Sequence, residues 1–378
     1  MKRSLCILLS LLTSCVAGAV LGAPALSSDV ALDVSQPFSA RAIAAVGAEQ
    51  YCVTGAVYHD EIPNDSAMAM LVDSRRHRVL WKADIPFAKD HFENVATACL
   101  RDGDAYYVLT EEHTDSVANR NRTELVVNQL SATGKLIKQR RIDIDANVWA
   151  NRFEASPDGL SIVGGTSTQS LEQGGKRSVF RAVFDRDLTR RQLTVLPTGA
   201  FSSDASAKLD GDSLRIAGQF LPNEGTAASS NDGYAASKID LRKERYVWST
   251  PVYPLKTEAA DAIFLPDGRT AFVGLNDRQQ IVSLLDSSGH VANRFAKPKA
   301  ICGVDALGIK GGAILQVVGK SCKDDHATSM LDIDLATGDV TSLRQVGENA
   351  SGTLFEDDAL VIVSAPARGG AVLHRTAR

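Results

Sequence analysis

The sequence predicts an all-β fold of seven repeated four-stranded units that close into a ring. Three observations support it: a short β-type run recurs seven times, a tight-turn signal precedes most of these runs, and long helical periodicity is absent. With 44% hydrophobic and 23% charged residues, the composition excludes a disordered, collagen-like or polytopic membrane protein. The runs are Tyr51–Val57, Ala105–Glu111, Leu160–Thr166, Leu214–Phe220, Thr270–Asn276, Ala313–Gly319 and Ala359–Ala365.

The turns before these runs are rich in glycine. Asp-Gly stands at 102–103 and 210–211, Pro-Asp-Gly at 157–159 and 266–268, and Gly-Gly at 311–312. Glycine supplies the positive φ that tight hairpins need, and aspartate favours such turns. We therefore assign these aspartates a structural role rather than a metal-binding or catalytic one.

Further strands flank each run. One precedes the turn, as at Phe153–Ser156, and a third follows a variable loop and often closes on Asp, as at Met68–Asp73 and Tyr234–Asp240. A fourth comes after another turn, as at Val79–Ile85. Four short strands joined in sequence form an up-and-down antiparallel sheet.

The seventh unit indicates how the ring closes. It reaches Arg378 without a fourth strand, whereas a spare strand, Ala31–Phe38, stands before the first unit. We predict that this strand pairs beside Ala371–Thr376, because a closed ring leaves no open array edge. The expected domain is a seven-bladed β-propeller over residues 29–378. A count of six or eight blades is the alternative if one long unit is misread.

Residues 1–23 predict an export signal. A basic start precedes the apolar run Leu5–Leu12 and a series of small residues. Two cleavage sites stay open: residues 12–15, Leu-Thr-Ser-Cys, resemble the bacterial lipobox, in which Cys15 is lipidated, whereas a cut at Ala23 suits an ordinary signal peptidase. No later run approaches about 20 apolar residues, so we expect membrane contact through a lipid anchor alone. The expected location is the periplasm, the outer membrane as a lipoprotein, or the exterior.

Four cysteines outside this segment predict two disulfides in an exported protein. Of the three possible pairings we favour Cys52–Cys99 and Cys302–Cys322, because each keeps its partners on nearby strands of the repeat. No Cys-x-x-Cys and no zinc-type spacing is present, so we expect no metal site.

Two units share an aspartate followed eight residues later by a tryptophan, at Asp73 and Trp81 and at Asp240 and Trp248. The stretch 331–338, Leu-Asp-Ile-Asp-Leu-Ala-Thr-Gly, adds an Asp…Thr-Gly turn. Together these resemble the repeats of quinoprotein-type (PQQ-like) propellers and of bacterial YVTN and WD-repeat-like propellers. The resemblance implies that the tryptophans dock one blade onto the next. Because two of seven units keep the tryptophan, we expect no cofactor.

Long loops predict a binding face over the first four units. Loops between second and third strands share one face of such a ring with the inter-blade connections, and those at 58–67, 112–123, 167–177 and 221–232 are long and polar. Trp149, which we place in an inter-blade connection, is either an interaction hot spot or a plug in the core between blades two and three. The candidate contacts are Tyr58, His59, Asp60, Glu112, His113, Asp115, Arg120, Arg122, Trp149 and Arg152.

The channel mouth is a second candidate site. Carboxylates and amides near the starts of the innermost strands suit a cation or a sugar-like ligand, and a water-filled polar channel is the alternative. The candidates are Asn94, Asn151, Ser206, Asp261, Asp305 and Ser351.

No His-Glu-x-x-His, Gly-x-Ser-x-Gly, P-loop or dinucleotide fingerprint is present, and Lys and Arg do not cluster as a nucleic-acid binder requires. We therefore predict a monomeric, exported, non-catalytic binding or scaffold propeller of the bacterial envelope, which engages another envelope or secreted protein. The alternative is a channel-centred enzyme, lactonase-like or a degenerate quinoprotein. A binding module should show a large exposed aromatic patch, and an enzyme a deep central pocket with convergent acids.

Overall fold

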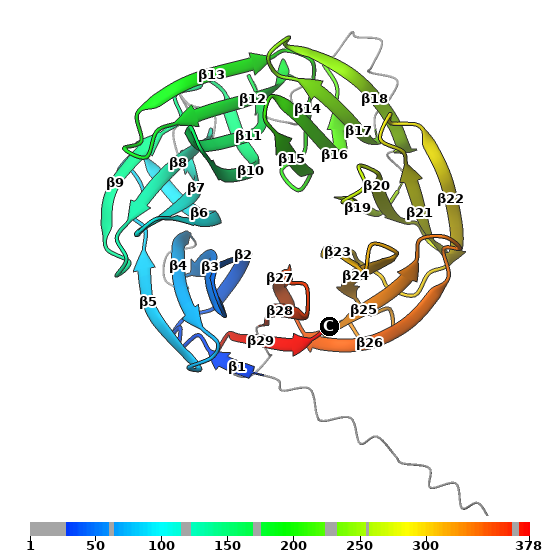
Figure 1. The fold of residues 1–378 in the computed structure, drawn as a ribbon. Coiled ribbons are helices and arrows are strands. Elements are labelled where there is room, and N and C mark those ends of the chain that lie inside the picture. Colours follow the sequence, from blue (N-terminus) through cyan, green and yellow to red (C-terminus); the bar gives the residue numbers. More distant parts are fainter. Residues whose placement is uncertain are drawn as a thin grey trace, which may run out of the picture.

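Seven antiparallel sheets stand as blades around a central channel (Figure 1). The computed structural model describes residues 28–59, 64–114, 122–168, 175–223, 233–254, 257–364 and 370–378. Within each blade the strands follow one another from the channel to the rim. The predicted seven-bladed propeller is therefore confirmed. Among the described residues there is no helix of the length and hydrophobicity needed to span a membrane.

The first four blades lie between residues 38 and 254. Blade 4 has a fifth strand because its innermost strand is divided in two. The strands are β2 (Phe38–Gly47), β3 (Gln50–Tyr58), β4 (Asp65–Asp73) and β5 (Arg78–Asp84); β6 (His91–Asp102), β7 (Ala105–Thr114), β8 (Thr123–Leu130) and β9 (Leu136–Arg141); β10 (Asn147–Ser156), β11 (Gly159–Ser167), β12 (Arg177–Phe184) and β13 (Arg190–Leu196); and β14 (Ala200–Phe201), β15 (Ser206–Asp210), β16 (Ser213–Leu221), β17 (Gly233–Asp240) and β18 (Arg245–Pro254).

The last three blades complete the ring. Blade 7 takes its outermost strand from the N-terminal side of the chain. The strands are β19 (Ala259–Phe264), β20 (Thr270–Leu275), β21 (Gln279–Leu285) and β22 (Val291–Pro298); β23 (Ala306–Lys310), β24 (Ile314–Lys320), β25 (Ala327–Asp334) and β26 (Val340–Glu348); and β27 (Ala350–Phe355), β28 (Ala359–Ser364), β29 (Val372–Ala377) and β1 (Ser28–Ala31).

The seven repeated runs of the sequence form the second strand of each blade. Every residue of β11, β20 and β28 is buried, because these strands are covered on both faces by the neighbouring blades. The outermost strands alternate between buried and exposed positions or are largely exposed, as in β9 and β22. The core is consequently a series of apolar layers between blades, such as the layer in which Leu109 of blade 2 and Phe180 of blade 3 pack in one cluster.

β1 closes the ring on β29, with Ser28 opposite Arg375 and Ala31 opposite Val372. The predicted closure is confirmed, although the predicted bounds Ala31–Phe38 are wrong. The ladder ends after Ala31 because Asp33 adopts a positive φ of 51° and turns the chain towards blade 1. Phe38 consequently begins β2.

Both predicted disulfides are present. Cys52 of β3 and Cys99 of β6 are buried and join blade 1 to blade 2. Cys302 and Cys322 are exposed and lie beside the bridge between Ile301 and Ser321, within blade 6.

The two repeat tryptophans pack against the next blade, as the resemblance implied. Trp81 stands edge-on to Tyr106 of β7 at 5.1 Å between ring centroids. A Cβ on Gly134, in a turn of blade 2, would come within 2.7 Å of the Trp81 ring, and one on Gly289 of blade 5 within 2.5 Å of Trp248. These turns need glycine for the close approach as well as for their positive φ.

Charge on the inner face of β1 should open the ring. Val30 is 1% exposed within the core layer between blades 7 and 1, whereas Ala31 is exposed on the same strand. Val30→Asp should lower the free energy of unfolding by about 3–5 kcal/mol, because it leaves an unpaired charge in an apolar layer. Ala31→Asp is the matched control and should change it by less than about 0.5 kcal/mol. Equal denaturant midpoints for the two variants would contradict this account of closure.

Candidate functional site

The innermost strand of blade 4 is broken at the channel. β14 and β15 both pair with β16, and residues 203–205 between them leave the ladder, while the Ser202 N–H still donates to the Gln219 carbonyl of β16 at 2.9 Å. The break is a tight turn in which the Ala205 N–H donates to the Ser202 carbonyl at 3.1 Å. Blade 6 has a comparable interruption, since an isolated bridge between Ile301 and Ser321 precedes β23, whereas in the other five blades one continuous innermost strand lines the channel. The break therefore sets the side chains of Ser203 and Asp204 apart from the regular repeat.

Side chains of blade 3 hold the broken strand in place. The indole N–H of Trp149 donates to the Phe201 carbonyl at 2.7 Å. The Asn151 amide donates to the carbonyls of Ser202 at 2.6 Å and Ser203 at 3.3 Å. The Ser203 carbonyl lies outside the ladder and needs another donor, which Asn151 supplies. Trp149 tethers Phe201, the last residue before the break.

Glycines make room for this arrangement. A Cβ on Gly165 of β11 would lie 2.3 Å from the Trp149 ring, and one on Gly218 of β16 would lie 2.5 Å from the Cβ of Ala205. Trp149 itself is 7% exposed and belongs to β10. The predictions of Trp149 as a loop residue, a surface hot spot or a plug between blades 2 and 3 are wrong, because its N–H bonds to blade 4.

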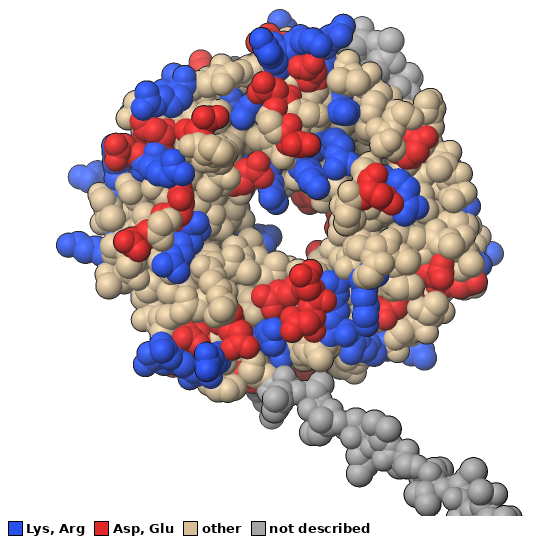
Figure 2. Space-filling view, in the orientation of Figure 1, with Lys and Arg blue, Asp and Glu red and all other residues tan. Residues whose placement is uncertain are grey.

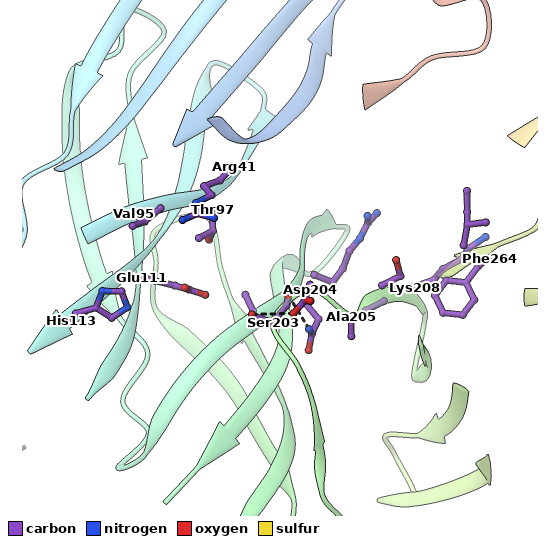
Figure 3. A pocket seen from close by; sticks show the side chains of 16 residues that line it. Arg41, Val95, Thr97, Glu111, His113, Ser203, Asp204, Ala205, Lys208 and Phe264 are labelled. Atoms are coloured by element: carbon purple, nitrogen blue, oxygen red, sulfur yellow. Dashed lines mark hydrogen bonds between the residues drawn. The ribbon is translucent and has the colours of Figure 1, made fainter. Parts of the chain in front are cut away.

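A cavity of about 840 Å³ lies against the break and extends over blades 1 to 5 (Figure 3). The channel is open in the space-filling view along it (Figure 2), so the cavity can be reached from solvent. Basic and acidic side chains are intermixed on that face. The cavity's polar side chains include Arg41, Glu111, His113, Asn151, Arg152 and Asp204.

Ion pairs occupy much of the wall formed by blades 2 and 3. His113 Nδ1 lies 2.8 Å from Glu93 Oε1, and the Arg152 guanidinium donates to Glu154 Oε2 at 2.8 Å. Burial raises the pKa of the Glu111 carboxyl, and the charges of His113 and Arg41 partly oppose that rise. This wall consequently holds a carboxyl that takes up a proton more readily than an ordinary glutamate.

A second shifted carboxyl belongs to the wall of blades 4 and 5. Burial raises the pKa of Asp261 to about 7, and the negative charge of Asp204 adds to the rise. Hydrogen bonds from the Ala262 N–H, at 2.6 Å, and from the Ser206 hydroxyl oppose it. Two neighbouring carboxylates resist ionising together, so this pair carries less than two negative charges near neutral pH.

The structure brings together three of the predicted channel residues, Asn151, Ser206 and Asp261, at or next to this cavity. Asn94 is fully buried: its Oδ1 accepts from the Ala67 N–H at 2.7 Å and its amide donates to the Ile85 carbonyl at 2.9 Å. The prediction of Asn94 as a channel ligand is therefore wrong, because it ties blade 1 to blade 2.

Two other predicted channel residues lie away from the cavity lining. Asp305 is exposed just before β23, and partial burial raises the pKa of its carboxyl. Ser351 of β27 accepts from the Ala40 N–H at 3.2 Å and so joins blade 7 to blade 1. Neither residue adds to the group that surrounds the break.

The predicted binding-face residues have different environments. Tyr58, at the end of β3, is 45% exposed, and His59 Nε2 lies 3.1 Å from Ser66 Oγ. His113 and Arg152 lie within strands and line the cavity. Asp60, Asp115 and Arg120 lie outside the described residues, as does Cys15.

Glu112 belongs to a buried ionic cluster at the base of blade 2. It is 2% exposed, and burial raises the pKa of its carboxyl. His91 is fully buried beside it and lies 3.2 Å from Glu124 Oε2, which also accepts from Arg141 at 2.8 Å. Arg122 completes the cluster on its outer side, with its Nε 3.7 Å from Glu124 Oε1. Glu112 as a surface contact is therefore wrong, because these charges satisfy one another inside the blade.

Comparison with known proteins shows the fold alone. The chain is similar in structure to the Dos1 propeller, with a TM-score of 0.52 and 10% sequence identity over 92% of this chain and 94% of that chain. No family model and no curated protein matches the sequence.

Asp261 should give the folded protein a pH dependence. Because its pKa rises from 3.8 to about 7, the folded state holds a proton here that the unfolded state releases between these values. The free energy of unfolding should therefore fall as the pH rises from about 4 to about 7, by at most about 1.4 kcal/mol per pH unit from this group. Asp261→Asn should remove that slope in denaturant titrations, and Asp104→Asn, in an exposed turn, should keep it. An unchanged slope in Asp261→Asn would refute this.

An added methyl group beside the Trp149 indole should destabilise the broken innermost strand of blade 4. Gly165→Ala should lower the free energy of unfolding by about 1–3 kcal/mol, because the added Cβ displaces Trp149 from the Phe201 carbonyl. It should also shift the tryptophan fluorescence of the folded protein. Gly347→Ala is the matched control, since its Cβ would meet no atom nearer than 4.0 Å. Equal free energies of unfolding for both variants would contradict the role assigned to the hydrogen bond between Trp149 and Phe201.

Proposed function

We propose that this protein is an exported, non-catalytic binding propeller of the bacterial cell envelope whose channel cavity holds a small polar ligand. The observation that carries the proposal is the cavity of about 840 Å³ at the break in blade 4. Small-molecule sites are typically concave, roughly 300–1,000 Å³ in volume, and lined by a few placed polar groups. Carboxyls with raised pKa values, here Glu111 and Asp261, are a further mark of such sites.

The exposed apolar surface favours the cavity over a protein-docking patch. Apart from Tyr58, the large exposed hydrophobic residues of the described chain lie on the outermost strands of several blades. Scattered single apolar residues are ordinary on a soluble surface and do not indicate an interface. These residues are Ile137, Val195, Val247, Val291, Val340 and Leu343.

The disulfides support the compartment in this proposal. Both pairs are consistent with an extracellular or periplasmic location, because thiols are kept reduced in the cytosol. The apolar N-terminal segment with its basic start supports export by the signal route.

A second candidate function is engagement of another envelope or secreted protein through the long-loop face. The buried ionic cluster of blade 2 favours it, because the ion pairs of Glu124 with Arg122 and Arg141 hold the start of β8, which follows the long loop. Exchanging the loops of the first four blades for short turns should then abolish capture of that partner from an envelope extract. Retained capture would remove this candidate.

We expect the protein to bind a small molecule from the cell that produces it. Native mass spectrometry of the mature protein incubated with a small-molecule extract of the producing cell should show a bound molecule. Ser203→Trp should lose it, because the indole occupies the part of the cavity beside Asp204, whereas Asp104→Trp, in an exposed turn, should keep it. Equal binding by both variants, or an empty wild-type protein, would contradict the proposal. Conversion of the ligand by the wild-type protein would assign the cavity to the enzyme alternative.

A further inference from the structure

One acceptor beside the break lacks a donor. Asn151 uses its amide group twice, on the carbonyls of Ser202 and Ser203. Its Oδ1 is buried and has no hydrogen-bond partner among the described residues. An unsatisfied buried acceptor costs free energy, and its partial negative charge adds to the electrostatic potential on this side of the cavity.

Asp204 adds a charge to the same side of the cavity. Its carboxylate is exposed and accepts a long hydrogen bond from the Ser203 hydroxyl, at 3.4 Å (Figure 3). No Lys, Arg or His of the described chain lies within ion-pair distance of it. Asp204 therefore offers an anionic acceptor to whatever occupies the cavity, next to the buried Oδ1 of Asn151.

Arg41 offers the opposite chemistry on the wall of blade 1. It extends from β2 and lies near Val95 and Thr97, across the cavity from Asp204 (Figure 3). Its guanidinium makes no ion pair or hydrogen bond with a described residue, although its charge acts on the Glu111 carboxyl, whereas Arg152 is paired with Glu154 and His113 with Glu93. Lys208 is the other cation without a described partner, and it lies beyond the break, towards Phe264 (Figure 3).

We infer that the ligand of the proposed channel site is a small dipolar molecule, with a cationic donor group at Asp204, beside Asn151, and a carboxylate or similar anion at Arg41. Each end then meets a charged group that makes no ion pair with a described residue. Charge-assisted hydrogen bonds in a confined site are stronger than neutral ones and give orientation. The raised pKa of Asp261 fits this arrangement, since it lowers the negative charge that Asp261 itself carries near neutral pH.

A series of ω-amino acids tests the charges of the ligand. Glycine, 4-aminobutanoate and 6-aminohexanoate differ in the distance between ammonium and carboxylate, and each has an N-acetyl and an amide form that lacks one charge. Glucose is the neutral reference. By calorimetry and ligand-observed NMR, at least one ω-amino acid should bind, and blocking either end should weaken it roughly 10- to 100-fold.

Variants of Arg41 and Asp204 test which residue binds which end of the ligand. Arg41→Gln should remove the preference for the free acid over the amide, and Asp204→Asn the preference for the free amine over the N-acetyl form. Arg78→Gln and Asp104→Asn, exposed and outside the cavity, should preserve both preferences. Loss of the acid preference in Lys208→Gln instead of Arg41→Gln would overturn the placement at Arg41.

The outcomes separate this inference from the proposed function on which it rests. Binding of glucose or of the blocked forms as tightly as the free ω-amino acids would overturn the dipolar ligand and leave the channel site standing. A native ligand that is uncharged or singly charged would do the same. Absence of any bound molecule, from the extract or from the probe series, would overturn both.

Discussion

The ladder between β1 and β29 is the constraint on which the rest of the molecule depends. Four residue pairs join the two ends of the described chain, and through them the apolar layer between blades 7 and 1 becomes continuous with the others. Every blade then has a neighbour on both faces, so no sheet face is left to solvent. The channel and its cavity exist because the circle is complete, since the cavity takes its walls from blades on several sides.

The site follows from a local departure from that regularity. Blade 4 gives up ladder hydrogen bonds over residues 203–205, and Trp149 and Asn151 of blade 3 donate hydrogen bonds to the carbonyls beside them. The amide that stabilises the break leaves its own oxygen buried and without a donor. Side chains of one blade thus hold the backbone of the next in a shape that exposes Asp204 to the channel, so a rigid ring can carry a specific site without a catalytic motif.

Sequence reasoning succeeded where burial dictates the pattern and failed where polar groups satisfy one another. The second strands were predictable because both faces are covered, which demands continuous apolar runs such as those of β20 and β28. Asn94 and Glu112 looked like surface residues because nothing in a linear sequence reveals their buried partners. The broken strand has no hydrophobic signature, although the pair Gly164-Gly165 was a signal that a large side chain, here Trp149, approaches the backbone.

The position of β1 also determines how the ring can be held. β1 is the outermost strand of blade 7, so Ser28 lies at the circumference of the disc rather than at either opening (Figure 1). A fatty-acyl group or any other tether upstream would attach the disc by its edge. Both openings would then stay accessible to diffusing molecules even when the protein lies close to a membrane.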